Sequence, residues 1–303
     1  MVPVEFWEWA IARVRKAYPS ITFIAEVYNP TLYRDYIFRG GFDYLYDKVG
    51  LYDTLRAVVR GEAPASAITA KWQCVDDIRN HMLYFMENHD EQRIASTFFC
   101  GDARKAIPAV VAEAFMGTNP LMVSAGQEIG ERGEDAEGFS GHDGRTTIFD
   151  YWSPQKLQKL FALGADGKVR KAAQTAYGHT AYAGKGLVLT AEEKELYHAY
   201  RSIVSPRESE SALTAGHFYD LMYVNLDNSQ KFDSNSHYAF LRRSERQLLL
   251  VVCNFGDKEA EMGVRTPSGI ERHPCHTSRC FFASEGSSLW SCLLRHPGIG
   301  FAG

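Results

Sequence analysis

The 303-residue sequence lacks several features that mark particular classes of protein. It contains no run of eighteen or more apolar residues, so nothing in it predicts a membrane span. Its 33 Lys and Arg residues are balanced by 37 Asp and Glu residues, and no basic cluster stands out, so a nucleic-acid partner is not expected. The amino end has no charged segment followed by an apolar core, as a signal peptide would have, which favours a cytoplasmic location without fixing it.

The spacing of the cysteines carries no chemical signature. The six cysteines form no C-x-x-C pair, which argues against a zinc ribbon or a redox dithiol and favours free thiols in a reducing compartment. Residues 134–143 are rich in acids, but they lack the alternating ligands of a calcium loop. The sequence therefore predicts neither a metal site nor a cofactor.

The 45% hydrophobic content is that of a globular protein with ample core material, and two short stretches carry chemical information. Residues 23–28 and 85–90 are both apolar runs that end in polar, carboxylate-bearing residues. Buried parallel strands have this pattern when they deliver reactive groups to the carboxyl edge of a sheet. Glu26 ends the first run, and Asn88-His89-Asp90 ends the second, so we expect them to lie close together.

Strand and helix patterns alternate through the first two thirds of the chain, which predicts a parallel α/β architecture. A helix is predicted over 5–17, where Pro19 ends it, and further helices over 49–60, 65–70, 103–115, 154–161 and 192–204. Strands are predicted at 21–27, 42–45, 82–86 and 120–125. Four such units are half of the eight that a closed barrel needs.

The pattern changes near residue 205. Runs at 217–224, 237–242 and 247–255 alternate or stay apolar between turn residues, which predicts a small antiparallel β-sandwich over 206–264. Residues 278–303 concentrate Cys, Ser, Arg and His without alternation, although a sandwich needs more strands here. We interpret residues 265–303 as an atypical tail, arising from a reading-frame error or from unrelated sequence.

The polar strand ends resemble those of the α-amylase family of retaining glycoside hydrolases. Glu26 resembles the end of that family's fifth barrel strand, Asn88-His89-Asp90 the end of the seventh, and residues 125–130 the end of the eighth. The resemblance implies that residues 1–205 form strands 5–8 of a (β/α)8 TIM barrel. It also implies an α-glucan as substrate, an oligosaccharide or polysaccharide.

The resemblance implies a role for each matched residue. Glu26 corresponds to the acid/base, and burial at the strand mouth would help it to hold a proton. Asp90 corresponds to a carboxylate that holds two hydroxyls of the distorted sugar, and His89 to a donor to the same ring. Asn88 is expected to brace the loop rather than to touch sugar.

Three further residues are weaker candidates for substrate binding. Arg93 could steady Asp90 or cap the helix that follows. Tyr28 and Trp152 each lie beside a matched motif and could stack on the apolar faces of pyranose rings. Packing in the core or at the rim is the alternative for all such aromatic residues.

The family's nucleophile lies on its fourth strand, which the resemblance places ahead of the predicted helix 5–17. The sequence is therefore expected to be a fragment that lacks the nucleophile and that self-associates through open barrel edges. Asp43 and Asp47 follow the second predicted strand, but the resemblance gives neither of them that role. Two alternatives remain open: a non-catalytic protein that binds sugar or a partner, and a transglycosylase.

Overall fold

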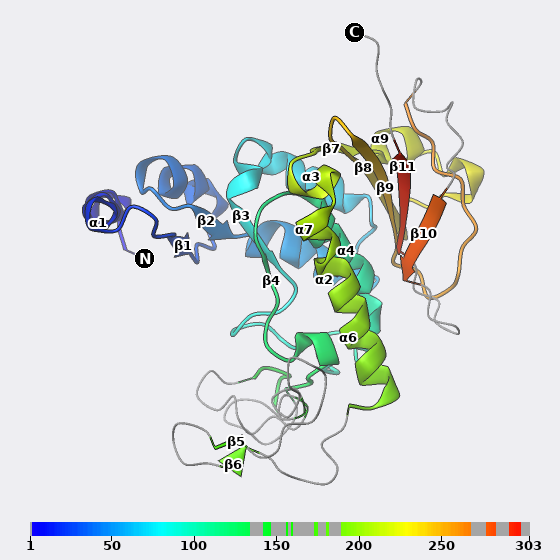
Figure 1. Ribbon diagram of the computed structural model, residues 1–303, viewed down its shortest axis with the longest axis horizontal. Helices are drawn as coiled ribbons and strands as arrows, with labels where there is room; N and C mark the ends of the chain where they lie inside the picture. Colours follow the sequence, from blue (N-terminus) through cyan, green and yellow to red (C-terminus); the bar gives the residue numbers. More distant parts are fainter. Residues whose placement is uncertain are drawn as a thin grey trace.

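The computed structural model describes residues 2–133, 142–146, 189–267 and the short strands at 173–174, 180–181, 277–282 and 291–297, together with Lys156 and Lys159. Two sheets dominate this part of the chain, a parallel one from the amino-terminal half and an antiparallel one from the carboxyl-terminal third (Figure 1). The predicted α/β class is confirmed. No helix among these residues is long and apolar enough to cross a membrane.

The parallel sheet has four strands in the order β1-β2-β3-β4, so strand order follows chain order. The strands are β1 (Ile24–Ala25), β2 (Tyr44–Tyr46), β3 (Met82–Phe85) and β4 (Leu121–Met122). All four predicted strands are present, but each is shorter than predicted, because each neighbouring pair is joined through only two matched residue positions. Closure of such a sheet into a barrel stays a prediction.

Helical segments precede β1 and connect the strands. They are α1 (Val4–Ala17), η1 (Pro30–Leu32), η2 (Asp35–Arg39), η3 (Lys48–Tyr52), α2 (Asp53–Val59), α3 (Ala67–Cys74), η4 (Asp76–His81), η5 (Ala103–Ala106) and α4 (Ile107–Met116). The predicted helix at 49–60 is thus divided into η3 and α2, and the one at 103–115 into η5 and α4. Pro108 lies in the first turn of α4, where its missing N–H leaves no helical hydrogen bond unmade.

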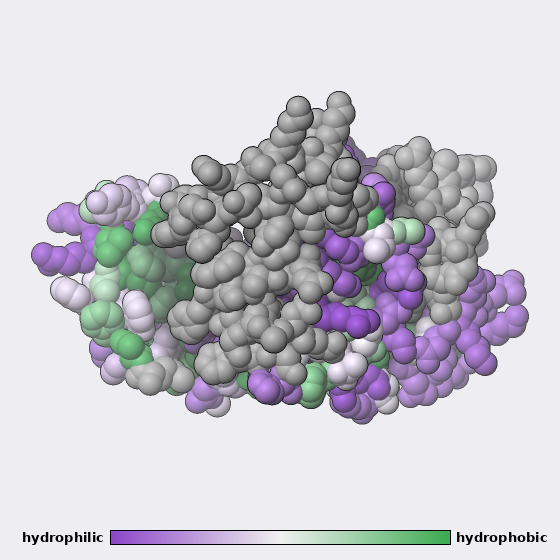
Figure 2. Space-filling model, turned by 90° about the horizontal axis from the view of Figure 1, so that it is seen from below, coloured by the Kyte–Doolittle hydropathy of each residue, from purple (hydrophilic) through white to green (hydrophobic). Residues whose placement is uncertain are grey.

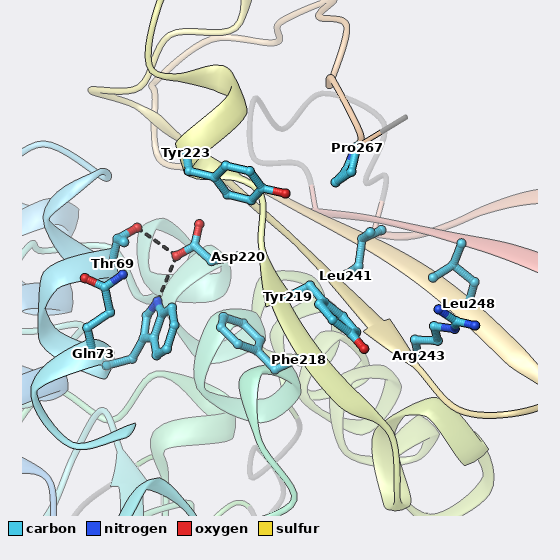
Figure 3. Close-up of a pocket in the computed structure, with 11 residues that line it drawn as sticks. Thr69, Gln73, Phe218, Tyr219, Asp220, Tyr223, Leu241, Arg243, Leu248 and Pro267 are labelled. Carbon is cyan, nitrogen blue, oxygen red and sulfur yellow. Dashed lines mark hydrogen bonds between the residues drawn. The ribbon is translucent and has the colours of Figure 1, made fainter. Parts of the chain in front are cut away.

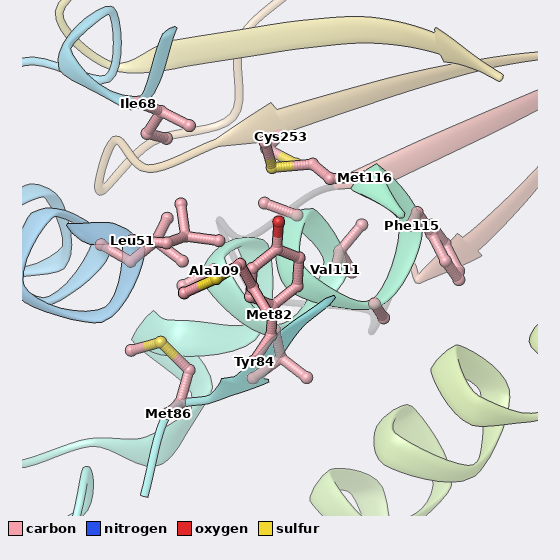
Figure 4. Close-up of a cluster of buried hydrophobic side chains, with 14 of the residues drawn as sticks. Leu51, Ile68, Met82, Tyr84, Met86, Ala109, Val111, Phe115, Met116 and Cys253 are labelled. Carbon is pink, nitrogen blue, oxygen red and sulfur yellow. The ribbon is translucent and has the colours of Figure 1, made fainter. Parts of the chain in front are cut away.

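The centre of the core lies where α4 packs against β3 (Figure 4). All ten residues of α4 and all four of β3 are buried. Cys253 of the antiparallel sheet lies beside Met116 at the end of α4, so both sheets contribute to one apolar cluster. The predicted division of the chain at residue 205 stays a prediction.

The antiparallel sheet has the strand order β10-β11-β9-β8-β7. Its strands are β7 (His217–Asp220), β8 (His237–Arg243), β9 (Gln247–Asn254), β10 (Thr277–Phe282) and β11 (Ser291–Pro297). The remaining described elements are η6 (Gln127–Ile129), β5 (Ala173–Gln174), β6 (Thr180–Ala181), α6 (Ala191–Val204), α7 (Pro206–Ser209), α8 (Ser211–Thr214), α9 (Met222–Asn225) and η7 (Ser229–Lys231). The strands from 217 onward lie in one sheet, so the two-sheet sandwich stays a prediction.

The structure differs from the sequence prediction at two places in this region. The strand predicted over 217–224 ends at Asp220, because the Asp220 Oδ1 atom accepts a hydrogen bond from the Met222 N–H (2.6 Å) and turns the chain into α9. The segment 265–303, which we interpreted as an atypical tail, supplies β10 and β11. Strand β11 pairs with β9 over seven positions, so backbone pairing makes strands there without a marked side-chain pattern. The predicted helix 154–161 lies mostly outside the described residues.

A buried arginine joins the antiparallel sheet to the helices. Arg242 of β8 is 2% exposed, and its guanidinium donates to the carbonyl oxygens of Ala212 (3.0 Å) and Met116 (2.8 Å). Burial lowers the pKa of Arg242 to about 10, which leaves it charged at neutral pH. The Met116 carbonyl is at the carboxyl end of α4, where a cation is favoured by the helix dipole.

The amino-terminal end of the molecule exposes apolar side chains. Phe6 and Trp9 of α1, Ile24 of β1 and Phe38 of η2 are 47%, 57%, 50% and 67% exposed. Figure 2 shows apolar residues gathered at this end of the molecule. Strand β1 is also an edge strand among the described residues, with β2 as its one neighbour. We refer to these four side chains as the amino-terminal apolar face.

The core also contains an acid, and we expect its titration to affect stability. Glu113 of α4 is 1% exposed, neither carboxylate oxygen has a well-formed hydrogen bond to a described residue, and the charge of Asp47 opposes its ionisation. Burial raises the pKa of Glu113 well above its usual value and that of Asp47 to about 6. The folded state therefore holds protons that the unfolded state releases, and stability should fall as pH rises from about 4 toward neutrality.

Glu113→Gln removes one of these titrations, so the variant should lose less stability than the wild type between pH 5 and pH 8. The sign follows because an acid whose pKa is raised in the folded state costs stability as the pH rises above its pKa in the unfolded state. Urea unfolding at both pH values measures the loss. Glu245→Gln, a change at an exposed hairpin residue, should track the wild type, and parallel losses in all three proteins would contradict the prediction.

We propose that the chain self-associates through the amino-terminal apolar face, because an open edge strand and exposed aromatic rings favour pairing. Light scattering after size-exclusion chromatography should give a mass above that of one chain. The double change Trp9→Glu with Phe38→Ser should raise the concentration needed for association by roughly tenfold or more. Leu226→Ser, at an exposed residue of another region, is the matched control. A wild type that stays monomeric at all concentrations would contradict the proposal.

Candidate active site

The polar strand ends meet at one edge of the parallel sheet. Glu26 directly follows β1, and two residues separate the end of β3 from residues 88–90. Carboxyl ends of parallel strands lie at the same edge of a sheet, which is where the candidate residues were expected to meet. The meeting of Glu26, His89 and Asp90 at this edge is the central feature of the candidate site.

His89 lies between the two carboxylates. Its Nε2 atom is 3.7 Å from the Glu26 Oε2 atom and 3.5 Å from the Asp90 Oδ2 atom. The side chains of Glu26, His89 and Asp90 are 33%, 39% and 58% exposed, so all three reach solvent. The burial that we expected for Glu26 is not present, because Glu26 follows the edge strand β1, which has a described neighbour on one side only.

Tyr28 adds a donor to this group. Its hydroxyl donates a hydrogen bond to the Glu26 Oε1 atom. Burial raises the pKa of Tyr28 well above its usual value, and the hydrogen bond to Glu26 raises it further, so the hydroxyl keeps its proton. Tyr28 thus orients one carboxylate oxygen of Glu26, and its expected stacking on sugar stays a prediction.

Asn88 braces the loop that carries His89 and Asp90. Its Oδ1 atom accepts hydrogen bonds from the backbone N–H groups of Asp90 (2.9 Å) and Glu91 (2.8 Å). Asn88 is 6% exposed, so it lies beneath the surface that His89 and Asp90 present. This arrangement fixes the backbone from which the two candidate residues project.

Arg93 has a different partner from the one expected. It donates to the Glu87 Oε2 atom through Nη1 (2.7 Å) and to the Thr146 Oγ1 atom through Nε (2.8 Å). Glu87 also accepts from the Ile94 N–H (2.7 Å), which closes the loop. Both charged side chains are at most 5% exposed, so Arg93 neither steadies Asp90 nor reaches a ligand at the surface. The sequence alone did not predict this ion pair, because Glu87 lies in the same polar strand end as Asn88, His89 and Asp90 and has no pattern that distinguishes it from them.

Two residues near the site were missed by the sequence analysis. The Lys48 Nζ atom lies 6.0 Å from the centre of the Tyr28 ring and forms an ion pair with Glu91 (3.4 Å). Tyr46, at the end of β2, is close enough to Glu26 and Asp90 for their charges to raise its pKa, after burial, which is the larger cause. Both residues lie at or just beyond the carboxyl end of β2. That position at the end of a parallel strand is the sequence signal from which they could have been predicted.

Trp152 lies outside the described residues, so its expected contact with sugar stays a prediction. Among the described residues, Glu26, His89 and Asp90 could also hold a metal ion, since one donor atom of each lies within 4.8 Å of the others. An imidazole with two carboxylates suits a transition metal such as zinc. All three groups are exposed, and such groups are common on surfaces without an ion.

Solved structures similar to this one are enzymes of the α-amylase family. A maltogenic α-amylase, AmyB from Thermotoga neapolitana, aligns over 98% of this chain and 57% of its own, with 16% identity and a TM-score of 0.59. An α-amylase from H. orenii aligns over 97% and 55%, with 16% identity and a TM-score of 0.59. The chain has their fold.

A third enzyme with the α-amylase fold is a cyclic α-maltosyl-(1→6)-maltose hydrolase from Arthrobacter globiformis. It aligns over 97% of this chain and 54% of its own, with 15% identity and a TM-score of 0.62. The chain thus spans little more than half the length of these structures. The sequence matches no protein-family model, and no curated protein sequence is detectably similar to it.

We expect the buried Glu87–Arg93 pair to control the stability of the loop that carries His89 and Asp90. Arg93→Met leaves an unpaired buried carboxylate and should cost about 3–5 kcal/mol of unfolding free energy. Arg104→Met breaks an ion pair that is 42% and 35% exposed, and should cost less than about 1 kcal/mol. Urea unfolding compares the two variants. Equal losses of unfolding free energy in the two variants would show that the buried pair stabilises the protein no more than the exposed pair does.

Proposed function

We propose that this chain contributes part of the active site of an α-glucan-acting retaining glycoside hydrolase or transglycosylase. The observation that supports the proposal is the meeting of Glu26, His89 and Asp90 at the carboxyl edge of a parallel sheet with the α-amylase fold. The enzymes with this fold include a cyclomaltodextrin glucanotransferase as well as hydrolases, so the proposal covers both transfer and hydrolysis.

Glu26 is the proposed acid/base. Its Oε1 atom accepts the Tyr28 hydrogen bond, so Oε2 is the oxygen left to carry the proton that the leaving glycosidic oxygen receives. The same oxygen then takes a proton from the incoming water or sugar hydroxyl. Tyr28 is the proposed positioning residue, because it holds Oε1 and thereby fixes the direction of Oε2.

Asp90 and His89 are the proposed sugar ligands. The Asp90 carboxylate accepts from sugar hydroxyls, and the His89 Nε2 atom, between the two carboxylates, can donate to or accept from the same ring. Such hydrogen bonds strengthen as positive charge develops on the sugar ring in the transition state. Their exposure leaves both side chains open to a ligand that arrives from solvent.

A retaining mechanism needs a nucleophile besides the acid/base. Oxygen atoms of Glu26 and Asp90 lie within 4.8 Å of one another, but Asp90 is the proposed sugar ligand and not the nucleophile. Asp43 accepts from the Phe23 N–H and pairs with Arg15 (2.6 Å), and Asp47 is buried, so neither is free for that role. We propose that the nucleophile comes from outside the described residues.

The proposal predicts that the 303-residue chain binds maltoheptaose at the candidate site but turns it over negligibly. Titration should shift the imidazole resonances of His89 in NMR spectra of protein labelled at histidine. Asp90→Asn and Glu26→Gln should each weaken this response, and Glu62→Gln, a change at an exposed acid of another loop, should leave it unchanged. Removing a member of a catalytic set costs orders of magnitude in rate, hence the expected lack of turnover.

Two results would contradict the proposal at different points. An unchanged His89 spectrum at saturating maltoheptaose would show that the cluster is not a sugar site. Turnover of maltoheptaose by the chain, lost in Glu26→Gln, would confirm the acid/base role but show that the described residues need no outside nucleophile.

A further inference from the structure

The outer strands of the antiparallel sheet bring two cysteines to opposite positions. Strands β8 and β9, which carry Leu241 and Leu248 in Figure 3, are followed across the sheet by β11 and then β10. β10 and β11 run antiparallel, and their register places Cys280 opposite Cys292. The sequence has only six cysteines, and no other strand pair within the described part of the chain sets cysteine opposite cysteine.

The backbone spacing at opposite positions of an antiparallel pair suits a disulfide. The two Cα atoms are about 4.5 Å or about 5.5 Å apart, depending on whether the two residues exchange hydrogen bonds. Disulfides join residues whose Cα atoms are usually about 4.4–6.8 Å apart, so both kinds of opposite position are within range. A bond between Cys280 and Cys292 therefore needs no change in the register of the two strands.

The two strands are held in the sheet to different extents. β11, which carries Cys292, pairs with β9 over seven positions as well as with β10. β10 is an edge strand among the described residues, with β11 as its one neighbour. Its register with β11 shifts between Cys280 and Phe282, and such irregularities increase the local twist of a strand pair. The cysteine pair thus lies where the regular pairing of the edge strand ends, and a covalent bond there would fix that strand.

We propose that Cys280 and Cys292 are a thiol pair that glutathione disulfide oxidises to a cross-strand disulfide. The thiolate of one cysteine attacks glutathione disulfide, which gives a mixed disulfide and releases one glutathione thiolate. The thiolate of the other cysteine attacks the protein sulfur atom of the mixed disulfide and releases the second glutathione. Two protein thiols are oxidised, one glutathione disulfide is reduced to two glutathione molecules, and these take up the two thiol protons.

The state of the pair then follows the ratio of reduced to oxidised glutathione. In a reducing compartment both cysteines are free thiols, as the sequence indicates, and the bond forms when that ratio falls. The bond closes a short loop, residues 281–291, and so restricts the unfolded chain. Oxidation should therefore raise the thermal unfolding midpoint of the protein by several degrees. This site is independent of the proposed function.

Peptide mapping of the 303-residue chain tests the bond directly. The chain is equilibrated with mixtures of reduced and oxidised glutathione, and the remaining thiols are alkylated. Trypsin cuts after Arg279 and Arg295, and a glutamate-specific protease cuts after Glu285, so Cys280 and Cys292 fall in different peptides. Mass spectrometry should find these two peptides joined in the oxidised samples and separate after reduction.

Matched cysteine variants show which residues are needed. Cys275 lies in a third peptide, residues 273–279, so a bond to it gives a joined peptide of different mass. Cys275→Ser should keep both the joined peptides and the higher midpoint, whereas Cys292→Ser should lose both. In reducing buffer Cys292→Ser should melt as the wild type does, which shows that the variant folds. In urea the selection of Cys292 over Cys275 should disappear, because the strand register is then absent.

Three results would overturn the proposal. The first is the absence of joined peptides at every glutathione ratio. The second is a bond from Cys275 to Cys280 or Cys292 in place of the proposed one in the folded protein. The third is a rise of the midpoint on oxidation that persists in Cys292→Ser.

Discussion

The carboxylate of Glu87 is 1% exposed, and the arrangement of the candidate site depends on the groups that bind this buried carboxylate. Burial raises the pKa of Glu87, while Arg93 and the Ile94 N–H act against that rise. A charge taken out of water is tolerated only when its partners are held in place, so this pair fixes the course of the chain between β3 and Ile94. Asn88 then ties the middle of the loop through two backbone donors. His89 and Asp90 can point outward because the residues on either side are fixed inward.

The same principle joins the two sheets. Arg242 and Asp220 are both charged and buried, and each is satisfied by groups from another part of the chain. Arg242 reaches the end of α4, and Asp220 reaches α3. The hydrogen bonds that satisfy these two buried charges therefore connect the amino-terminal and carboxyl-terminal parts of the chain.

The sequence predicted the features that arise from local pattern. The four parallel strands and the meeting of Glu26, His89 and Asp90 follow from apolar runs that end in polar residues. The partner of Arg93 did not follow, because Glu87 and Asp90 are both acids within reach and only burial selects between them. Strands β10 and β11 also did not follow, since backbone pairing along β9 decides them rather than side-chain alternation. The end of β7 was set by one hydrogen bond of Asp220, which no periodicity records.

The guanidinium of Arg242 has a consequence for how the protein folds. It donates to carbonyl oxygens at the end of α4 and within α8, and an arginine without these acceptors would be a bare charge in the core. Neither α4 nor β8 can therefore reach its final packing before the other, although more than a hundred residues separate them along the chain. Contacts of such long range slow folding, and they also make the two parts lose structure together. The antiparallel sheet and the parallel sheet thus pack on one shared core, and the Arg242 contacts join them.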